Sequence, residues 1–200
     1  NNLYAEKILK LPDIWNAHAG FTYERKYNEL PFLKNKNFTF GSLNNFRKIS
    51  DETVYVWSEI LKKVPNSNLI LKSADFCSDE ILMNKFKLEG VDNRVKILNK
   101  IDFIEKEDHL NVYRKIDLCL DTFPHNGVTT TFEALWMGVP VIVLKGKNFC
   151  SRCGESIIKN TKIDGLIAED LNDYISKAIH LSKDINILTQ IRENLYQSVL

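Results

Sequence analysis

DTFPHNGVTTTFEALWMGVP, residues Asp121 to Pro140, is the stretch from which the architecture of this chain is most readily inferred. An apolar run precedes it, and the loop that follows contains Gly127. A helix is then expected to begin with three consecutive threonines and to end at Gly138 and Pro140, the usual order of helix terminators. The stretch therefore predicts a strand, a glycine-bearing loop and a helix, which together form the repeating unit of a parallel α/β sheet.

The predicted start of this helix is suited to binding an anion. The first N–H groups of a helix have no partner within it and lie at the positive end of its dipole, so phosphate binds there readily. Gly127 would let the backbone approach a ligand closely because it has no side chain, and Thr129, Thr130 and Thr131 add hydroxyl groups. Glu133 falls on the same helix face, one turn further along, where it could accept hydrogen bonds from ribose hydroxyls. These residues predict a nucleotide-sugar site.

The composition is that of an ordinary globular chain. Hydrophobic residues make up 44% and charged residues 26% of the 200 residues, which argues against disorder and suffices for one domain or one half of a larger protein. The net charge of +1 gives no electrostatic reason to expect nucleic acid or membrane as a partner. No apolar run approaches the roughly 20 residues that span a bilayer, and no signal-peptide pattern is present. A cytoplasmic location and a truncated chain are expected.

Short apolar runs alternate with amphipathic segments along the chain. This alternation predicts a Rossmann-like, doubly wound parallel sheet with helices on both faces. In such sheets ligands bind at the carboxyl ends of the strands, where the loops after Gly41, at 101–109 and at 124–130 should open. Residues 1–37 are expected to be an irregular lead-in, and residues 38–200 the nucleotide-sugar-binding domain. The expected strands are 38–40, 68–72, 95–98, 116–120, 139–144 and 166–168, and the expected helices 51–64, 79–89, 105–114, 129–137, 151–160, 171–181 and 185–200.

Several side chains outside the central stretch are further candidates. Lys48 follows the Gly41 turn and could reach the same pyrophosphate, although a solvated surface lysine is the common alternative. His109 could stack its ring on a nucleobase, or it could be a surface histidine in a charged turn. Lys106 could likewise be a ligand-binding residue or a surface residue of that turn. His125 could contact a sugar or could merely shape the turn.

Cys150 and Cys153 have the C-x-x-C spacing. A structural zinc site would need two more ligands in a second pair, and Cys77 and Cys119 are single and distant in sequence. A packed or partly exposed thiol pair is therefore the favoured interpretation, and no metal site is expected. Arg152, at the start of the helix after the fifth strand, is a further phosphate-facing candidate.

These motifs together resemble the catalytic region of the protein O-GlcNAc transferase/SPINDLY family. Its members are GT-B glycosyltransferases of family 41, usually preceded by tetratricopeptide repeats. The resemblance implies that this domain is the C-terminal lobe of the GT-B fold. It is carried by Phe40–Ile49 (FGSLNNFRKI), Lys106–His109 (KEDH), the central signature in Leu120–Pro140, and Ser151-Arg152 followed by Gly154.

Carried over position by position, the resemblance implies a role for each matching residue. Lys48 would stabilise the departing diphosphate, His109 would contact the base, Thr129 and Thr130 the pyrophosphate, and Glu133 the ribose. The remaining matching residues are also expected to bind substrate: Asn45, Lys106, His125, Gly127 and Arg152.

Three positions depart from the animal O-GlcNAc transferases. Asn45 stands where those enzymes have a glutamine that contacts the diphosphate, and Val128 replaces a histidine of the phosphate loop. His125 replaces a cysteine near the donor sugar. Relatives use either UDP-GlcNAc or GDP-fucose, and these departures leave both donors open for this chain. Three consecutive threonines are more similar to the bacterial and SPINDLY-like branch.

The implied function is the donor-binding half of an inverting glycosyltransferase that transfers a sugar from a nucleotide diphosphate to a Ser or Thr hydroxyl of a protein. In the family an N-terminal lobe supplies the general base, and the repeats help select the protein acceptor. The resemblance implies no metal or other cofactor, and this chain by itself is expected to be inactive. The alternatives are a nucleotide-binding module without turnover and a GT-B enzyme with a small-molecule acceptor.

Overall fold

The structure is a computed structural model that describes residues 28–72, 76–98 and 106–198. Before residue 28 it also describes isolated positions, among them Ile14–Asn16. Only the backbone is described for Phe76, residues 106–108 and Ser198.

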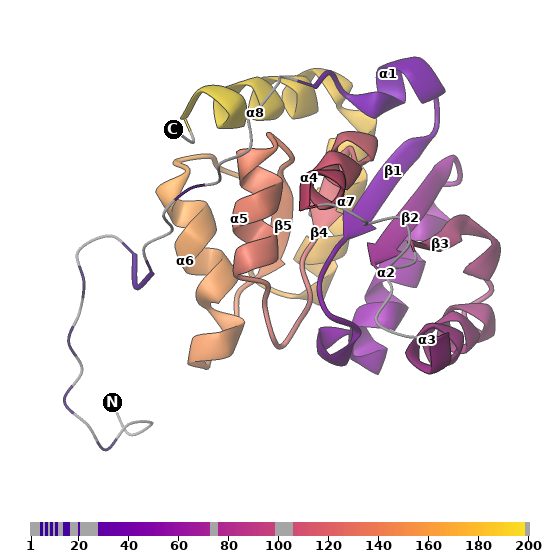
Figure 1. Cartoon of the computed structure of the whole chain (residues 1–200), viewed down its shortest axis with the longest axis horizontal. Coiled ribbons are helices and arrows are strands. Elements are labelled where there is room, and N and C mark those ends of the chain that lie inside the picture. Colours follow the sequence, from indigo (N-terminus) through magenta and orange to yellow (C-terminus); the bar gives the residue numbers. More distant parts are fainter. Residues whose placement is uncertain are drawn as a thin grey trace.

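The described residues form a parallel sheet with the strand order β3-β2-β1-β4-β5-β6 (Figure 1). Every neighbouring pair of strands is parallel. The first strand, β1, is central, and β2 and β3 follow it toward one edge of the sheet. β4 then lies on the other side of β1, and β5 and β6 continue to the opposite edge, so the topological switch lies between β1 and β4. This topology confirms the predicted Rossmann-like class. The strands are β1 (Phe38–Ser42), β2 (Ser67–Lys72), β3 (Val95–Leu98), β4 (Leu118–Leu120), β5 (Val141–Leu144) and β6 (Ile167–Ala168).

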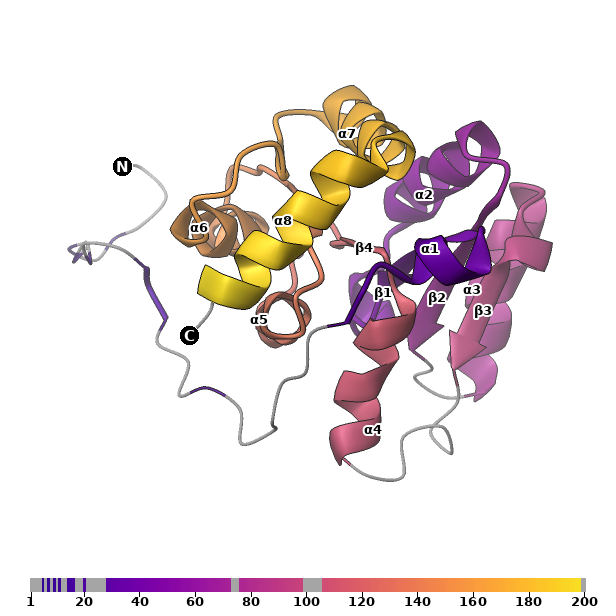
Figure 2. The same cartoon turned by 90° about the horizontal axis from the view of Figure 1, so that it is seen from above.

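Helices cover both faces of the sheet, as predicted. α2 and α7 lie side by side on one face, and α4 and α5 lie on the other (Figure 2). Short 3-10 turns η1, η2, η4 and η5 occupy Phe46–Lys48, Asp92–Arg94, Val112–Lys115 and Phe149–Ser151. The α-helices are α1 (Pro31–Asn35), α2 (Asp51–Lys63), α3 (Phe76–Leu88), α4 (Lys106–Asn111), α5 (Thr129–Trp136), α6 (Cys153–Asn160), α7 (Leu171–Lys183) and α8 (Ile185–Ser198).

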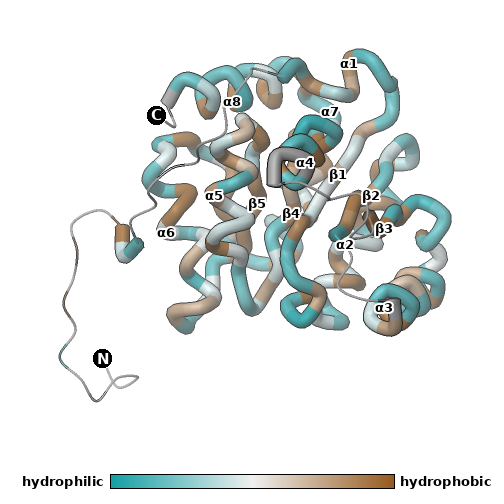
Figure 3. The backbone as a smooth tube through the Cα atoms, viewed as in Figure 1, coloured by the Kyte–Doolittle hydropathy of each residue, from teal (hydrophilic) through white to brown (hydrophobic). Residues whose placement is uncertain are grey.

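The core lies between the sheet and these helices. All of β1 and β4 and most of β5 are buried, as expected for central strands covered on both faces. β5 is correspondingly hydrophobic in Figure 3, whereas the outer turns of α1 and α8 are mostly hydrophilic. Trp57 of α2 and Tyr174 of α7 are fully buried beneath the helix layer.

Two glycines have positions that only glycine fits well. A Cβ at Gly41 in β1 would lie 2.3 Å from the side chain of Ile116, so the strand can approach that residue only without a side chain. Gly138 has φ +72°, the left-handed conformation that ends α5. The predicted end of this helix is therefore confirmed.

Some element boundaries differ from the sequence prediction. Within the segment expected to be irregular, Pro31–Asn35 forms α1, because Pro31 is preorganised for a helix start. Asp117 holds it to the sheet by accepting the N–H of Phe32 at 2.8 Å and that of Thr39 at 2.8 Å. The strand predicted from Ile116 begins only at Leu118, since the N–H of Ile116 closes the preceding 3-10 turn. In the described part of the chain, no helix is long and apolar enough to cross a membrane.

Candidate functional site

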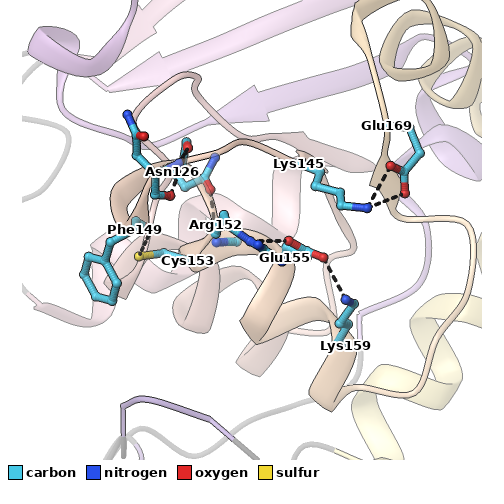
Figure 4. A network of polar contacts seen from close by, with 11 residues as sticks. Asn126, Lys145, Phe149, Arg152, Cys153, Glu155, Lys159 and Glu169 are labelled. Carbon is cyan, nitrogen blue, oxygen red and sulfur yellow. Dashed lines mark hydrogen bonds and ion pairs between the residues drawn. The ribbon is translucent and has the colours of Figure 1, made fainter. Parts of the chain in front are cut away.

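Three segments meet where β1, β4 and β5 end, at the lower edge of Figure 1. They are η1, the β4–α5 loop (residues 121–128), and η5 with the start of α6. Asn126 joins them: its carbonyl accepts Lys48 Nζ at 2.8 Å, and its N–H donates to the carbonyl of Cys150 at 3.0 Å. Its side-chain oxygen accepts the N–H of Gly154 at 3.2 Å (Figure 4). The loop is thus fixed from both sides.

Asp121 lies beneath this loop and is buried. Its Oδ1 accepts three hydrogen bonds, from the N–H of Thr122 (2.9 Å), the N–H of Gly127 (2.7 Å) and Nδ2 of Asn44 (3.0 Å). Asn44 in turn accepts the hydroxyl of Thr130 at 2.7 Å. Burial raises the pKa of Asp121 to about 6, while these hydrogen bonds act in the opposite direction. One carboxylate therefore connects β1, the loop and the start of α5.

Gly127 serves the packing of the loop itself. A Cβ there would lie 2.6 Å from the Thr130 hydroxyl, 2.9 Å from Oδ1 of Asn44 and 2.9 Å from Oδ1 of Asp121. The sequence suggested that glycine leaves room for a ligand. In the structure the room is filled by these three side chains, so close approach within the chain is sufficient reason for glycine.

The start of α5 presents unpaired backbone donors. The first hydrogen bond of the helix runs from the N–H of Phe132 to the carbonyl of Val128. No acceptor among the described residues pairs with the N–H groups of Thr129, Thr130 and Thr131, and Val128 supplies no side-chain cap. Thr129 is exposed. An anion can therefore reach this end of the helix from solvent.

Glu133 lies one turn into α5 and is held by two aromatic partners. His109 Nε2 lies 2.9 Å from Glu133 Oε2, and the Tyr113 hydroxyl donates to the same oxygen at 3.0 Å and to the carbonyl of Thr130 at 3.1 Å. The side chains of His109 and Glu133 are 16% and 12% exposed, so the interpretation of His109 as a solvated surface histidine is wrong. Burial, followed by the charge of the Glu133 carboxylate, raises the pKa of Tyr113. The phenol therefore stays protonated and can donate a hydrogen bond.

The other predicted site residues lie at the margins of this arrangement. Asn45 is exposed and caps η1 by accepting the N–H of Arg47. His125 is exposed, and its carbonyl accepts the Thr122 hydroxyl. The side chain of Lys106 lies outside the described residues. The structure thus brings together Lys48, Gly127, Thr129 and Thr130 around the loop, and His109 and Glu133 one turn away.

Arg152 points along its own helix. Its Nε donates to Glu155 at 3.0 Å, and Lys159 donates to the other oxygen of Glu155 at 2.7 Å (Figure 4). These two cations hold the pKa of Glu155 below its usual range although burial raises it. A hollow of about 310 Å³ beside them is lined by Trp15, Phe149, Arg152, Cys153, Glu155, Ser156 and Lys159.

The two cysteines of the C-x-x-C motif lie in η5 and at the start of α6. Cys150 and Cys153 are both free, and the buried Sγ of Cys153 lies 3.2 Å from the carbonyl of Phe149. Burial raises the pKa of Cys153, which disfavours the reactive thiolate. Among the described residues no group of three or more His, Cys, Asp or Glu side chains could hold a metal ion.

Sequence reasoning missed Asn44, Tyr113 and Asp121. In the sequence, Asn44 and Asp121 belong to the motifs given above, but no role was predicted for either of them. The position of Asp121, directly after a buried strand at the carboxyl edge, was the signal that could have identified it. Tyr113 lies four residues after His109, which places both on one side of a helical turn.

The chain matches the model of glycosyl transferase family 41 over residues 21–199. SPINDLY of Arabidopsis thaliana is 34% identical over 194 residues, which cover 95% of this chain and 21% of that protein. SPINDLY of Hordeum vulgare is 32% identical over 206 residues, covering 100% of this chain and 21% of that protein. The chain therefore spans about a fifth of the length of these curated relatives.

Solved structures show the same relationship. A Thermobaculum terrenum O-GlcNAc transferase mutant is 32% identical, with a TM-score of 0.77, over 82% of this chain and 32% of that chain. A mutant of S. aureus TarM shares the fold alone. It is 12% identical, with a TM-score of 0.63, over 100% of this chain and 38% of the TarM chain. The sheet and its helices are thus a lobe of the GT-B fold, and the resemblance to the O-GlcNAc transferase/SPINDLY proteins is confirmed. The chain belongs to glycosyl transferase family 41.

Proposed function

We propose that this chain is the donor-binding half of an inverting glycosyltransferase that transfers GlcNAc or fucose from a nucleotide diphosphate to a Ser or Thr hydroxyl of a protein. The observation that carries this proposal is the start of α5, where the N–H groups of Thr129, Thr130 and Thr131 have no acceptor among the described residues. Membership in family 41 and the names of the relatives, "Probable UDP-N-acetylglucosamine--peptide N-acetylglucosaminyltransferase SPINDLY", support it.

Each residue then has a defined task. The diphosphate lies against the N–H groups of α5, with Lys48 beside it, and Glu133 accepts hydrogen bonds from the ribose. His109 contacts the base from the neighbouring helix. As the glycosidic bond breaks, negative charge builds on the leaving diphosphate, and the helix start and the Lys48 ammonium stabilise it there. These positive groups make a metal ion unnecessary in this proposal.

The proposal extends to parts of the protein that this chain does not contain. A second lobe supplies the general base and part of the acceptor groove, and tetratricopeptide repeats help to select a protein acceptor in the cytoplasm. The chain by itself binds the donor without turnover. Asn45, Lys106, His125 and Arg152 complete the donor pocket when that lobe is present.

Calorimetric titration of the chain with UDP-GlcNAc and with GDP-fucose tests the proposal. One of the two should bind with measurable affinity, and Glu133→Gln should weaken it, since a neutral amide is a poorer acceptor for ribose hydroxyls than a carboxylate. Exposed Glu52→Gln on α2 is the matched control. If neither nucleotide sugar binds to the folded chain, the donor-site assignment is wrong.

A turnover assay separates this function from its rivals. The chain and the full-length protein are each given the donor that binds, with and without a peptide acceptor. The proposal predicts transfer to the peptide by the full-length protein alone. Transfer or donor hydrolysis by the chain alone would contradict the assignment of the general base to another lobe, and transfer only to a small-molecule acceptor would favour that alternative.

A further inference from the structure

Asp121 is a fully buried acid that the proposed reaction does not use. It follows β4 directly, at the switch point between β1 and β4. Among the described residues its carboxylate has three hydrogen bonds, from Thr122, Gly127 and Asn44, and Oδ1 accepts all three. Its other oxygen, Oδ2, is buried and accepts none among the described residues. A carboxylate needs many donors when it is buried, so this uneven arrangement calls for a functional reason.

The hydrogen bonds of Oδ1 reach both sides of the candidate anion site. The hydrogen bond from the N–H of Gly127 fixes the β4–α5 loop. Asn44 donates to Oδ1 and accepts a hydrogen bond from the Thr130 hydroxyl, and so links Asp121 to the start of α5. Lys48, which donates to Asn126 in the same loop, is the cation that offsets the charge of Asp121. The groups that would bind a diphosphate are therefore arranged around a carboxyl group that no solvent reaches.

A bound diphosphate would change the charge balance at this position. It brings two negative charges next to Lys48, and negative charge nearby favours the neutral form of a carboxyl group. The vacant Oδ2 can take the proton without losing any hydrogen bond, because Oδ1 remains the acceptor for all three donors. The pKa of Asp121, already about 6 from burial, lies close enough to neutrality for such a change.

We propose that Asp121 is a positioning residue of the donor site: its buried carboxyl group fixes the β4–α5 loop through Gly127 and Asn44, and its Oδ2 takes up a proton from solvent when a nucleotide sugar binds. The proposal rests on the proposed function of the site. It adds a proton that enters with the donor and leaves with the diphosphate.

The thiols and phenols around Asp121 do not titrate in the same pH range. Burial raises the pKa of each of them, so they stay neutral near pH 7. Among the described residues, the titratable groups that interact with the Asp121 carboxylate include Lys48 of η1, Tyr113 of η4, Cys119 of β4, Cys153 of α6 and Tyr174 of α7.

The chain offers two informative substitutions and a matched control. Asp121→Asn resembles the protonated acid, since its carbonyl oxygen can take the place of Oδ1 and its amide the place of Oδ2. Asp121→Ala removes the acceptor. The control is Asp117→Asn at the other end of β4: that acid is also buried with its pKa raised to about 6, but its hydrogen bonds go to Phe32 and Thr39, away from the loop.

The experiment is calorimetric titration with the nucleotide sugar that binds, whose diphosphate diester has no group titrating near pH 6. Repeating it in buffers of different ionisation enthalpy counts the protons taken up at pH 7. The wild type should take up a fraction of a proton and bind about three- to ten-fold more tightly at pH 6 than at pH 8. Asp121→Asn should take up none and bind equally at both pH values. Asp121→Ala should bind about ten-fold or more weakly throughout.

The control separates positioning from loss of stability. Asp117→Asn should keep the proton uptake and the pH dependence of the wild type, even if it unfolds more easily. Uptake that persists in Asp121→Asn, or an affinity of Asp121→Ala within about two-fold of the wild type, would overturn the proposal while the donor site stands. A wild type that binds no nucleotide sugar would refute the donor site and this inference together.

Discussion

A single ammonium group ties the β4–α5 loop to the segment after β1. Lys48 Nζ donates to the carbonyl of Asn126 at 2.8 Å, in the loop that leads into α5. Lys48→Ala should therefore weaken nucleotide-sugar binding by about 1–3 kcal/mol, as expected for a lost charge-assisted hydrogen bond. Calorimetric titration measures it, with exposed Lys63→Ala as the control. An unchanged affinity would count against the role of Lys48.

The hydroxyl of Tyr113 orients Glu133. It donates to Glu133 at 3.0 Å and to the carbonyl of Thr130 at 3.1 Å, so Tyr113→Phe leaves His109 as the partner of the carboxylate among the described residues. We expect nucleotide affinity to fall by about 0.5–1.5 kcal/mol, the net value of one hydrogen bond. Exposed Tyr55→Phe on α2 should have no effect. Equal affinities in the two variants would show that Tyr113 does not orient the acid.

Individual residues were predicted unevenly from the sequence. Thr129, Thr130 and Glu133 lie within one helix, so their common face follows from helical geometry. Asn44 and Asp121 are 77 residues apart, and nothing local to either residue indicates that they are hydrogen-bonded. Their contact exists because β1 and β4 are neighbours in the sheet, which only the three-dimensional fold establishes.

At the scale of elements, the start of α2 is hydrogen-bonded to the β4–α5 loop of the candidate site. Ser50 caps α2 by accepting the N–H of Thr53 at 3.1 Å, and its hydroxyl donates to the carbonyl of Phe123 at 3.0 Å. Ser50→Ala should lower the free energy of unfolding by about 0.5–2 kcal/mol. Urea unfolding measures this, and the exposed Glu52→Ala in the same turn is the control. A loss no larger than that of the control would contradict the capping role.

The periodic helices and the apolar strands, including the short β3 and β6, were predicted, whereas α1 and the 3-10 turns were not. The helix 51–64 and the central strand 139–144 have clear apolar patterns, and the structure places α2 and β5 there. α1 and the 3-10 turns have too few residues to show any period. α1 depends instead on Asp117, which is 85 residues from Phe32 in the sequence. Short elements held by distant contacts cannot be read from local sequence.

For the whole molecule, the two buried acids that flank β4, Asp117 and Asp121, make stability depend on pH. Burial raises the pKa of Asp117 and of Asp121 from 3.8 to about 6. Between these values the folded state binds more protons than the unfolded state, so the free energy of unfolding should fall as pH rises from about 4 to about 6, by roughly 3 kcal/mol per group at most. The stability from these groups is fully present below pH 3.8 and is lost above pH 6.

Urea unfolding at pH 4.5, 5.5 and 6.5 measures this slope. Asp117→Asn should be less stable than the wild type, because an amide cannot accept from both Phe32 and Thr39, but its slope should be shallower. The pKa values of Glu155 and Asp173 are lowered from 4.5 and 3.8 by their cationic partners, so these groups act in the opposite sense, and their effect on this slope fades as pH rises above 4.5 and 3.8. A slope equal to that of the wild type would contradict the assignment to Asp117.

A crystal structure of this chain with its bound nucleotide sugar measures the donor site most directly. The diphosphate should lie within hydrogen-bond distance of the N–H groups of Thr129 and Thr130 and of Lys48 Nζ, with a ribose hydroxyl on Glu133. A diphosphate bound elsewhere on the chain, with the start of α5 left unpaired, would contradict the proposed donor site.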